Sequence, residues 1–257
     1  MTIERSDGSP ELAERPQKRQ LPIWLESILL LCHALGQAVL IKALLVQAFY
    51  IPSESMEPGL VRNDRILVQK VSYWFGGTPQ RGDVVVFKDP GGWLSGDEAV
   101  GPPNAVTKVM AKIGLYPSGG HLVKRVIGVA GDVIHCCDDE GRLVVNGVAL
   151  NEKAYARTDG ADCYGPMLGC GDGWDAGPVP DGSVFVMGDN RSHSADSTVH
   201  MCREGQRDCV PGEEFVPVDL VVGKVLVVLW PHNHFRWLHR PDDFDRVPDA
   251  GAHPPSG

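Results

Sequence analysis

The stretch "HLVKRVIGVAGDVI" (residues 121–134) is typical of β-structure, because it is a short run rich in Val and Ile that is interrupted only by Gly and Asp turn signals. In an extended strand, successive side chains point to opposite faces of the sheet. Lys124 therefore shares a face with Leu122 and Val126, and Arg125 points to the other face. The alternation does not show which face is buried, so a surface lysine and a buried lysine both remain open.

The same composition recurs in other short runs, and together they predict a mainly β fold. These runs are residues 64–73, 82–90, 141–150, 182–190 and 221–231. One short helix is expected among them. Val106, Val109, Met110 and Ile113 recur at helical spacing after Asn104, a residue type that caps helices.

A long apolar segment, residues 22–50, precedes the predicted strands. As a helix that rises about 1.5 Å per residue, it would extend roughly 40 Å, more than the hydrocarbon core of about 30 Å. Its apolar residues lie all round the helix, which favours a membrane-spanning helix over the alternative, an amphipathic helix of a soluble protein. Arg15, Lys18 and Arg19 precede it and predict a cytoplasmic N-terminus, with everything after the segment outside.

The chain is therefore expected to have four parts. We predict a cytoplasmic tail (residues 1–21), a single transmembrane helix (22–50), an exterior β domain (51–240) and a polar C-terminal tail (241–257). The net charge of −9 argues against nucleic acid as a partner, because nucleic-acid binding requires clustered basic side chains that neutralise phosphates.

Six of the seven cysteines fall in the predicted exterior part, where disulfides form. We expect bridges from Cys163 to Cys170 and from Cys202 to Cys209, while free, buried cysteines remain the alternative. The neighbouring residues Cys136 and Cys137 are expected to be hard to join to each other. A C-terminal group of histidines has no carboxylate or Cys at ligand spacing, so a solvated loop is predicted there and no metal site; these are His232, His234 and His239.

Two serines, Ser53 and Ser55, lie in "PSESMEP" directly after the apolar segment. A serine becomes a useful nucleophile only when a base takes its proton, and no histidine of the chain is placed convincingly for that role. Lysine can serve if burial lowers its pKa far below about 10.4. Since arginine does not lose its proton in proteins, Lys124 rather than Arg125 is the candidate base.

Three motifs occur in order behind the apolar segment: "PSESMEP", "VKRVIGVAGD" and "VMGDNRSHSADS". Together they resemble the motifs of the bacterial type I signal peptidases, over roughly residues 22–75 and 120–231. The resemblance implies one transmembrane helix followed by an extracytoplasmic antiparallel β-sheet catalytic domain of signal peptidase type. Residues 89–120 and 156–180 correspond to insertions, where this family varies.

The resemblance also implies a role for each matching residue. Ser55 is the expected nucleophile, Lys124 the general base, Ser53 a donor to the oxyanion, and Ser194 the residue that orients the lysine amine. The loop that carries Ser194 is expected to be supported by Asp189, Asn190, Arg191 and Asp196.

Some matching residues also have a purely structural interpretation. Gly131-Asp132 and Gly188-Asp189 are typical of turns, and we take this interpretation as primary for both aspartates. Two positions depart from the family pattern: Thr198 stands where an Arg is common, and Glu54 places a charge between the two serines.

By resemblance, the chain is a serine endopeptidase that needs no cofactor or metal. It is expected to remove signal peptides with small residues before the cut from secreted preproteins, at the outer face of the cell membrane and in contact with lipid. A self-cleaving repressor-type protease shares the Ser-Lys chemistry, but the membrane segment argues against it. The non-enzyme alternative is an anchored exterior β domain with a binding role, against which the intact set of Ser55, Lys124 and Ser194 argues.

Overall fold

The computed structural model describes residues 22–94, 103–112, 119–157, 173–202, 206 and 209–251, and for residues 38–44, 74, 75 and 112 it describes the backbone alone. The chain divides into two compact units, Met1–Ile41 and Lys42–Gly257, which are treated separately. The predicted pair Cys163 and Cys170 lies outside the described residues.

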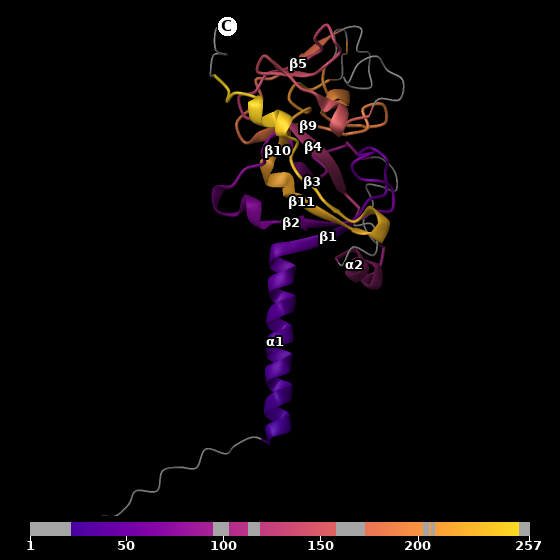
Figure 1. Ribbon diagram of the computed structural model, residues 1–257, viewed down its shortest axis with the longest axis vertical. Helices are drawn as coiled ribbons and strands as arrows, with labels where there is room; N and C mark the ends of the chain where they lie inside the picture. The colour runs from indigo at the N-terminus through magenta and orange to yellow at the C-terminus, as the bar shows by residue number, and fades with distance from the viewer. Residues whose placement is uncertain are drawn as a thin grey trace, which may run out of the picture. The chain divides into compact units, whose positions relative to one another are not determined.

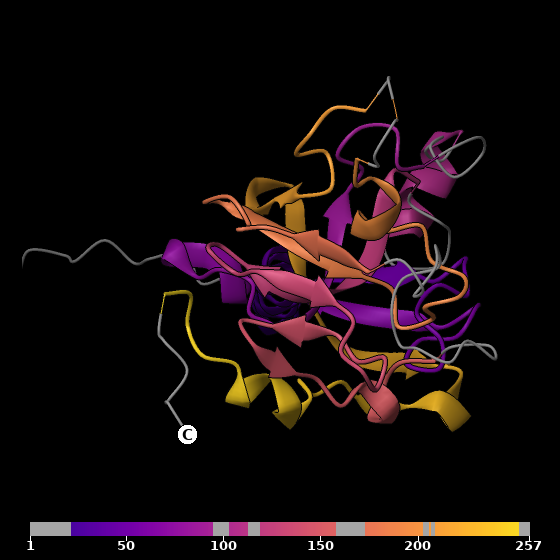
Figure 2. The same cartoon turned by 90° about the horizontal axis from the view of Figure 1, so that it is seen from above.

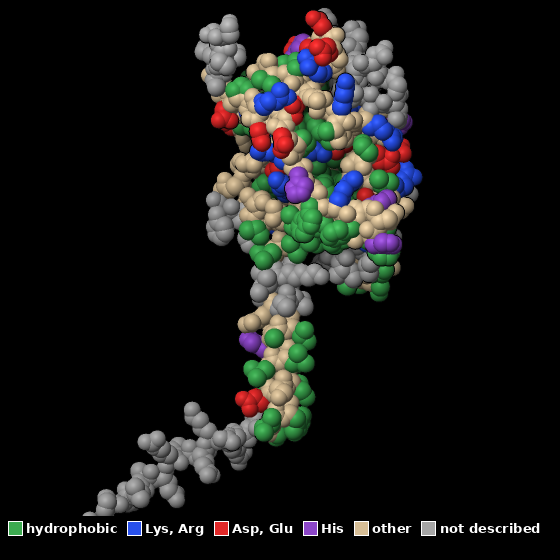
Figure 3. Space-filling view, viewed as in Figure 1, with side chains coloured by type: hydrophobic (Ala, Val, Ile, Leu, Met, Phe, Trp, Pro, Cys, Tyr) green, Lys and Arg blue, Asp and Glu red, His purple; other side chains and the backbone are tan. Residues whose placement is uncertain are grey.

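The apolar segment forms helix α1 (Ile23–Leu45). Hydrophobic side chains project from the described part of this helix (Figure 3), and Ile23 is 83% exposed. The predicted helix over residues 22–50 is too long at its C-terminal end, because Val46–Tyr50 forms strand β1 and pairs with β2. Among the described residues, no helix meets both the length and the hydropathy that a membrane crossing requires.

The second unit consists mainly of strands. The strands are β1 (Val46–Tyr50), β2 (Arg65–Gln69), β3 (Val84–Lys88), β4 (His121–Val129), β5 (Ile134–Cys136), β6 (Val144–Val145), β7 (Val148–Ala149), β8 (Trp174–Ala176), β9 (Ser183–Met187), β10 (Val216–Pro217), β11 (Val221–Trp230) and β12 (Arg236–Trp237). Each predicted run contains a strand, and residues 121–134 contain β4 and the first residue of β5. The mainly β prediction is confirmed.

These strands form two antiparallel sheets (Figure 1). The larger sheet has the order β1-β2-β11-β3-β4-β9-β10, with β12 added to β11, and the smaller has the order β7-β6-β5-β8. Neighbours in the larger sheet come from distant parts of the sequence. Magenta β4 lies beside orange β9, with Arg125 opposite Met187 and Val126 opposite Val186 (Figure 2).

The predicted helix is confirmed as α2 (Ala105–Lys112). Asn104 caps it as expected, because its side-chain Oδ1 accepts a hydrogen bond from the Thr107 N–H at 2.8 Å.

Both faces of β4 are buried, which the alternation pattern alone could not reveal. Leu122 and Val126 pack in one hydrophobic cluster with Val85, whereas Ile127 belongs to a second cluster. Lys124 and Arg125 are consequently both buried, although their side chains leave opposite faces of the strand.

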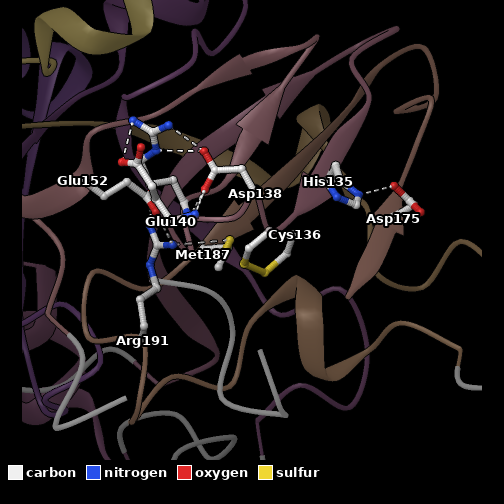
Figure 4. Close-up of a disulfide and its surroundings, with 10 residues drawn as sticks. His135, Cys136, Asp138, Glu140, Glu152, Asp175, Met187 and Arg191 are labelled. Atoms are coloured by element: carbon white, nitrogen blue, oxygen red, sulfur yellow. Dashed lines mark hydrogen bonds and ion pairs between the residues drawn. A yellow bond between two sulfur atoms is a disulfide. The ribbon is translucent and has the colours of Figure 1, made fainter. Parts of the chain in front are cut away.

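The cysteine predictions have mixed outcomes. The bridge between Cys202 and Cys209 is confirmed. Cys136 and Cys137 are also joined (Figure 4), so the expectation that these neighbours resist bridging is wrong. Within a strand, neighbouring side chains point to opposite faces of the sheet. Strand β5 ends at Cys136, so Cys137 lies outside the strand and its side chain is not held on the opposite face.

The segment after residue 240 is not simply a polar tail. A short 3-10 helix, Asp242–Arg246, places Phe244 in the core, where Val247 is buried as well. Phe244 packs against Tyr155, with ring centroids 6.0 Å apart. Two apolar side chains thus attach this segment to the β domain, a long-range contact that its polar composition conceals.

Candidate active site

A cavity of about 370 Å³ opens between the end of β1, the serine loop that follows it and strand β4. Ser53, Ser55 and Lys124 all line this cavity. Sixty-nine residues of sequence separate Ser55 from Lys124, so only the folded sheet brings these two side chains to one site. The cavity is the place where their chemistry can be combined.

The serine loop is fixed through its backbone. The Asn190 N–H donates to the Ser55 carbonyl oxygen at 3.1 Å, and the Asn190 side-chain Nδ2 donates to the Glu54 carbonyl oxygen at 3.2 Å. The hydroxyl oxygens of Ser53 and Ser55 lie 3.3 Å apart. Ser55 is 9% exposed, which leaves its hydroxyl at the cavity wall with little contact to bulk water.

Lys124 lies on β4 opposite Val85 of β3 and is 4% exposed. Leu122 and Val126, which share its strand face, are buried with it. Burial in apolar surroundings disfavours the charged form of an amine. Lys124 is thus a buried lysine on the wall of the cavity.

Asp196 organises the segment that carries Ser194. Its carboxylate accepts hydrogen bonds from the Ser194 hydroxyl at 2.6 Å and from the Gly188 N–H at 2.9 Å. The Thr198 hydroxyl donates to the same carboxylate at 2.7 Å. The bond to Asp196 therefore fixes the orientation of the Ser194 hydroxyl, which uses its one proton in this contact.

Thr198 therefore takes a defined structural part in this segment. It stands at the position where the family with the three similar motifs commonly has an Arg. Its N–H and its hydroxyl both donate hydrogen bonds to the carboxylate of Asp196. A short side chain here completes the hydrogen bonds of Asp196 without an added charge.

Gly188 brings the serine loop and the Ser194 segment into close approach. A Cβ atom at this position would lie 2.2 Å from Ser194 Oγ and 2.4 Å from the Ser55 carbonyl oxygen. Neither distance is tolerated, so only glycine allows the two segments to pack this closely.

Asp189 and Asp132 do more than form turns, the interpretation that we took as primary. Asp189 pairs with buried Arg125 through two hydrogen bonds of 2.7 Å. Burial lowers the pKa of the Arg125 guanidinium, but the Asp189 carboxylate offsets this effect and the pKa is raised overall. Asp132 forms a similar two-bond pair with Arg81 at 2.6 Å.

Arg191 is buried beneath the same loop and pairs with Glu152 (Figure 4). Its Nη2 donates to Glu152 Oε1 at 2.6 Å, and its Nε donates to the Gly188 carbonyl oxygen at 2.9 Å. The Tyr155 hydroxyl also donates to Glu152 at 2.9 Å. Burial raises the pKa of the Glu152 carboxyl, and the pKa stays raised overall although the bonds from Arg191 oppose the rise. The two side chains lie in ion-pair geometry.

Sequence reasoning missed Glu152. It lies outside all three motifs, and nothing in "LNEKAY" distinguishes it from a surface glutamate. The histidine group near the C-terminus has an unexpected partner too, because His234 Nδ1 lies 2.9 Å from Asp64 Oδ1. Within the described part of the chain, no group of three or more His, Cys, Asp or Glu side chains could hold a metal ion.

Comparison with known proteins connects this site to a family. Residues 24–230 match the family described as "Signal peptidase, peptidase S26". The chain belongs to this family. Its activity is therefore that of a serine peptidase, the cleavage of signal peptides from preproteins.

Two relatives extend the match over most of the chain. "Probable signal peptidase I" of Mycobacterium leprae (strain TN) is 38% identical over 261 residues, which cover 92% of this chain and 86% of that protein. "Signal peptidase I" of Mycobacterium tuberculosis (strain ATCC 25618 / H37Rv) is 43% identical over 203 residues, which cover 74% of this chain and 66% of that protein.

A solved structure, that of a signal peptidase I from Enterococcus faecalis V583, covers 59% of this chain and 96% of its own. It shares 22% of residues with this peptidase at a TM-score of 0.33.

Proposed function

We propose that this peptidase uses Ser55 as its nucleophile and Lys124 as its general base. The neutral amine of Lys124 takes the hydroxyl proton as Ser55 Oγ attacks the scissile carbonyl carbon of a preprotein. The amine then gives this proton to the departing amino group. Water attacks the resulting acyl-enzyme ester in a second step, with the same lysine as base, and releases the signal peptide.

The negative charge that develops on the carbonyl oxygen needs donors. The Ser55 N–H and the Ser53 hydroxyl are the proposed pair, since Ser53 lies beside the nucleophile and lines the same cavity. Ser194 is proposed to position the lysine amine, because Asp196 fixes the orientation of the Ser194 hydroxyl.

Asp189, Asn190, Arg191 and Asp196 act through structure in this proposal. Asn190 holds the backbone of the serine loop, and Asp189 and Arg191 are anchored by buried ion pairs. None of these side chains is proposed to touch the reacting atoms.

One observation carries the proposal: a lysine that is only 4% exposed lines the same cavity as two neighbouring serines. A lysine in a strand is usually a solvated surface residue, and burial of its amine needs a compensating role.

The test is cleavage of a purified preprotein by the full chain in detergent or lipid. We expect cleavage after the signal peptide, and its loss in Ser55→Ala, which removes only the hydroxyl oxygen. Ser72→Ala is the matched control, because Ser72 lies outside the cavity and bonds Gln69. Full activity in Ser55→Ala would exclude this serine as the nucleophile.

The proposal extends to the cell membrane, with the apolar segment as a single-pass anchor, the N-terminus cytoplasmic and the catalytic domain outside. The exposed apolar side chains of α1 support it, because water does not favour a helix covered with Ile, Leu and Trp. Secreted preproteins with small residues before the cut are the proposed substrates.

An aromatic surface near the serine loop also supports contact with lipid. Trp230, Phe235 and Trp237 are more than half exposed, and such aromatic side chains favour membrane interfaces. Arg236, which lies between the last two, donates to the Pro58 carbonyl oxygen at 3.1 Å. This bond connects the aromatic surface to the loop that carries Ser55.

Orientation is tested with a protease added to right-side-out vesicles or intact cells. We expect degradation of the part after residue 51 and protection of an N-terminal epitope tag. Vesicles opened with detergent provide the control, in which the tag is degraded as well. Protection of the β domain in closed vesicles would contradict the proposed topology while leaving the Ser-Lys chemistry untouched.

A further inference from the structure

Trp93 forms part of the wall of the catalytic cavity, although no motif includes it. Its side chain lines the cavity that Ser55 and Lys124 also line, and it is almost fully buried. It belongs to the hydrophobic cluster that covers the Lys124 face of β4. The edge of its indole meets the ring of Phe87, with centroids 5.9 Å apart and planes at 89°.

The backbone of the loop around Trp93 is held by hydrogen bonds to one carboxylate. Asp89 accepts hydrogen bonds from the N–H groups of Gly91 at 2.9 Å, Trp93 at 3.0 Å and Leu94 at 3.3 Å. Three backbone bonds to a single side chain fix the path of the loop. The backbone that carries the indole is thus fixed within its own segment.

His200 supports the second side of the indole. The two rings are stacked, with centroids 4.3 Å apart and planes at 7°. Burial lowers the pKa of the His200 ring, which favours the neutral ring at neutral pH. Its Nε2 is buried and has no hydrogen-bond partner among the described residues.

The stack also joins two separate parts of the site. His200 directly follows the 3-10 helix Ser197–Val199, which Asp196 caps through the Thr198 N–H. Asp196 in turn holds the Ser194 hydroxyl. Trp93 is therefore tied to the segment that positions the catalytic lysine in the proposed mechanism.

We propose that Trp93, held in place by His200, is a specificity-determining wall that excludes bulky substrate side chains next to the scissile bond. The indole is rigid and is packed against both Phe87 and His200, which restricts its retraction to admit a larger group. Trp93 lies within the insertion at residues 89–120, and His200 follows the last motif, so this wall is a feature of this chain outside the three motifs. The inference rests on the proposed function and names the selectivity of that same cavity.

The test compares kcat/KM for matched preprotein substrates in which each position flanking the cut carries Ala, Leu or Phe in turn. The selectivity ratio is kcat/KM for the bulky residue divided by that for Ala. In Trp93→Ala, we expect this ratio to rise at least about tenfold at one flanking position, the effect that pocket size has on related side chains. Trp93→Phe should give a smaller rise, since it restores part of the wall.

Two sets of variants separate a wall from a merely structural role. Val210→Ala is the control, because Val210 is an exposed apolar side chain outside the cavity, and the selectivity ratio of this variant should equal that of the wild type. His200→Phe keeps a stacking ring and should retain the selectivity. His200→Ala should raise the ratio at the same substrate position as Trp93→Ala.

An unchanged ratio in Trp93→Ala, or an equal loss of kcat/KM for every substrate, would overturn the proposal. If Trp93→Ala does not fold, as judged by circular dichroism, the same criteria apply to Trp93→Phe and His200→Ala. Failure of the proposed function has a different signature, because the wild type would then not cleave even the Ala substrate.

Discussion

Replacing Lys124 with arginine is expected to reduce signal-peptide cleavage by about 10²- to 10⁴-fold, the range that general bases contribute. Arginine keeps the positive charge and most of the bulk, but it does not give up its proton and so cannot act as a base. Lys124→Ala should lose activity to a similar extent. The measurement is kcat/KM for a preprotein substrate, with membrane binding and circular dichroism to confirm that each variant is folded.

Two further measurements complete this experiment. Lys108→Arg makes the same exchange on the exposed surface of α2 and should leave kcat/KM unchanged. Wild-type activity should rise with pH between about pH 6 and 11 as the amine loses its proton, since only the neutral form accepts one from Ser55. Substantial cleavage by Lys124→Arg would exclude Lys124 as the base, whatever the family of the chain.

Breaking the ion pair between Arg125 and Asp189 is expected to cost about 3 to 5 kcal/mol of folding free energy. Both side chains are buried, so Asp189→Ala leaves an unpaired guanidinium without solvent. The measurement is chemical unfolding of the full chain in detergent. Cleavage should fall as well, because Asp189 lies between Gly188 and Asn190, which both lie against the serine loop.

A double variant distinguishes the cost of an unpaired charge from the value of the pair itself. Arg125→Met with Asp189→Leu removes both charges and should be less destabilised than the sum of the single variants. Arg142→Met, which breaks an exposed ion pair with Asp138, should change stability little. Equal destabilisation by the buried and the exposed single variants would contradict this account of Arg125.

Local patterns in the sequence predict local structure well here. The strand runs, the Asn104 cap of α2 and the bridge from Cys202 to Cys209 each depend on residues within about ten positions of one another. The sequence also points to Ser55 and Lys124 through their motifs, and the fold places both on one cavity. Their roles in catalysis stay predictions.

Longer-range features could not be predicted from the sequence. The partner of Arg191 is Glu152, which lies 39 positions earlier and in no motif. Phe244 and Val247 are buried in the core although their neighbours are polar. The end of α1 at Leu45 depends on pairing of Val46–Tyr50 with β2, and local hydropathy does not show that a strand competes for these residues.

The position of β11 in the larger sheet has a consequence for when the enzyme becomes active during its synthesis. Ser55 follows β1, which pairs with β2, whereas Lys124 lies on β4, which pairs with β3. Strand β11, near the C-terminal end of the chain, lies between β2 and β3. A growing chain that has not yet produced Val221–Trp230 lacks the strand that joins these two halves, so the sheet holds the proposed nucleophile and base together only after this strand has been made.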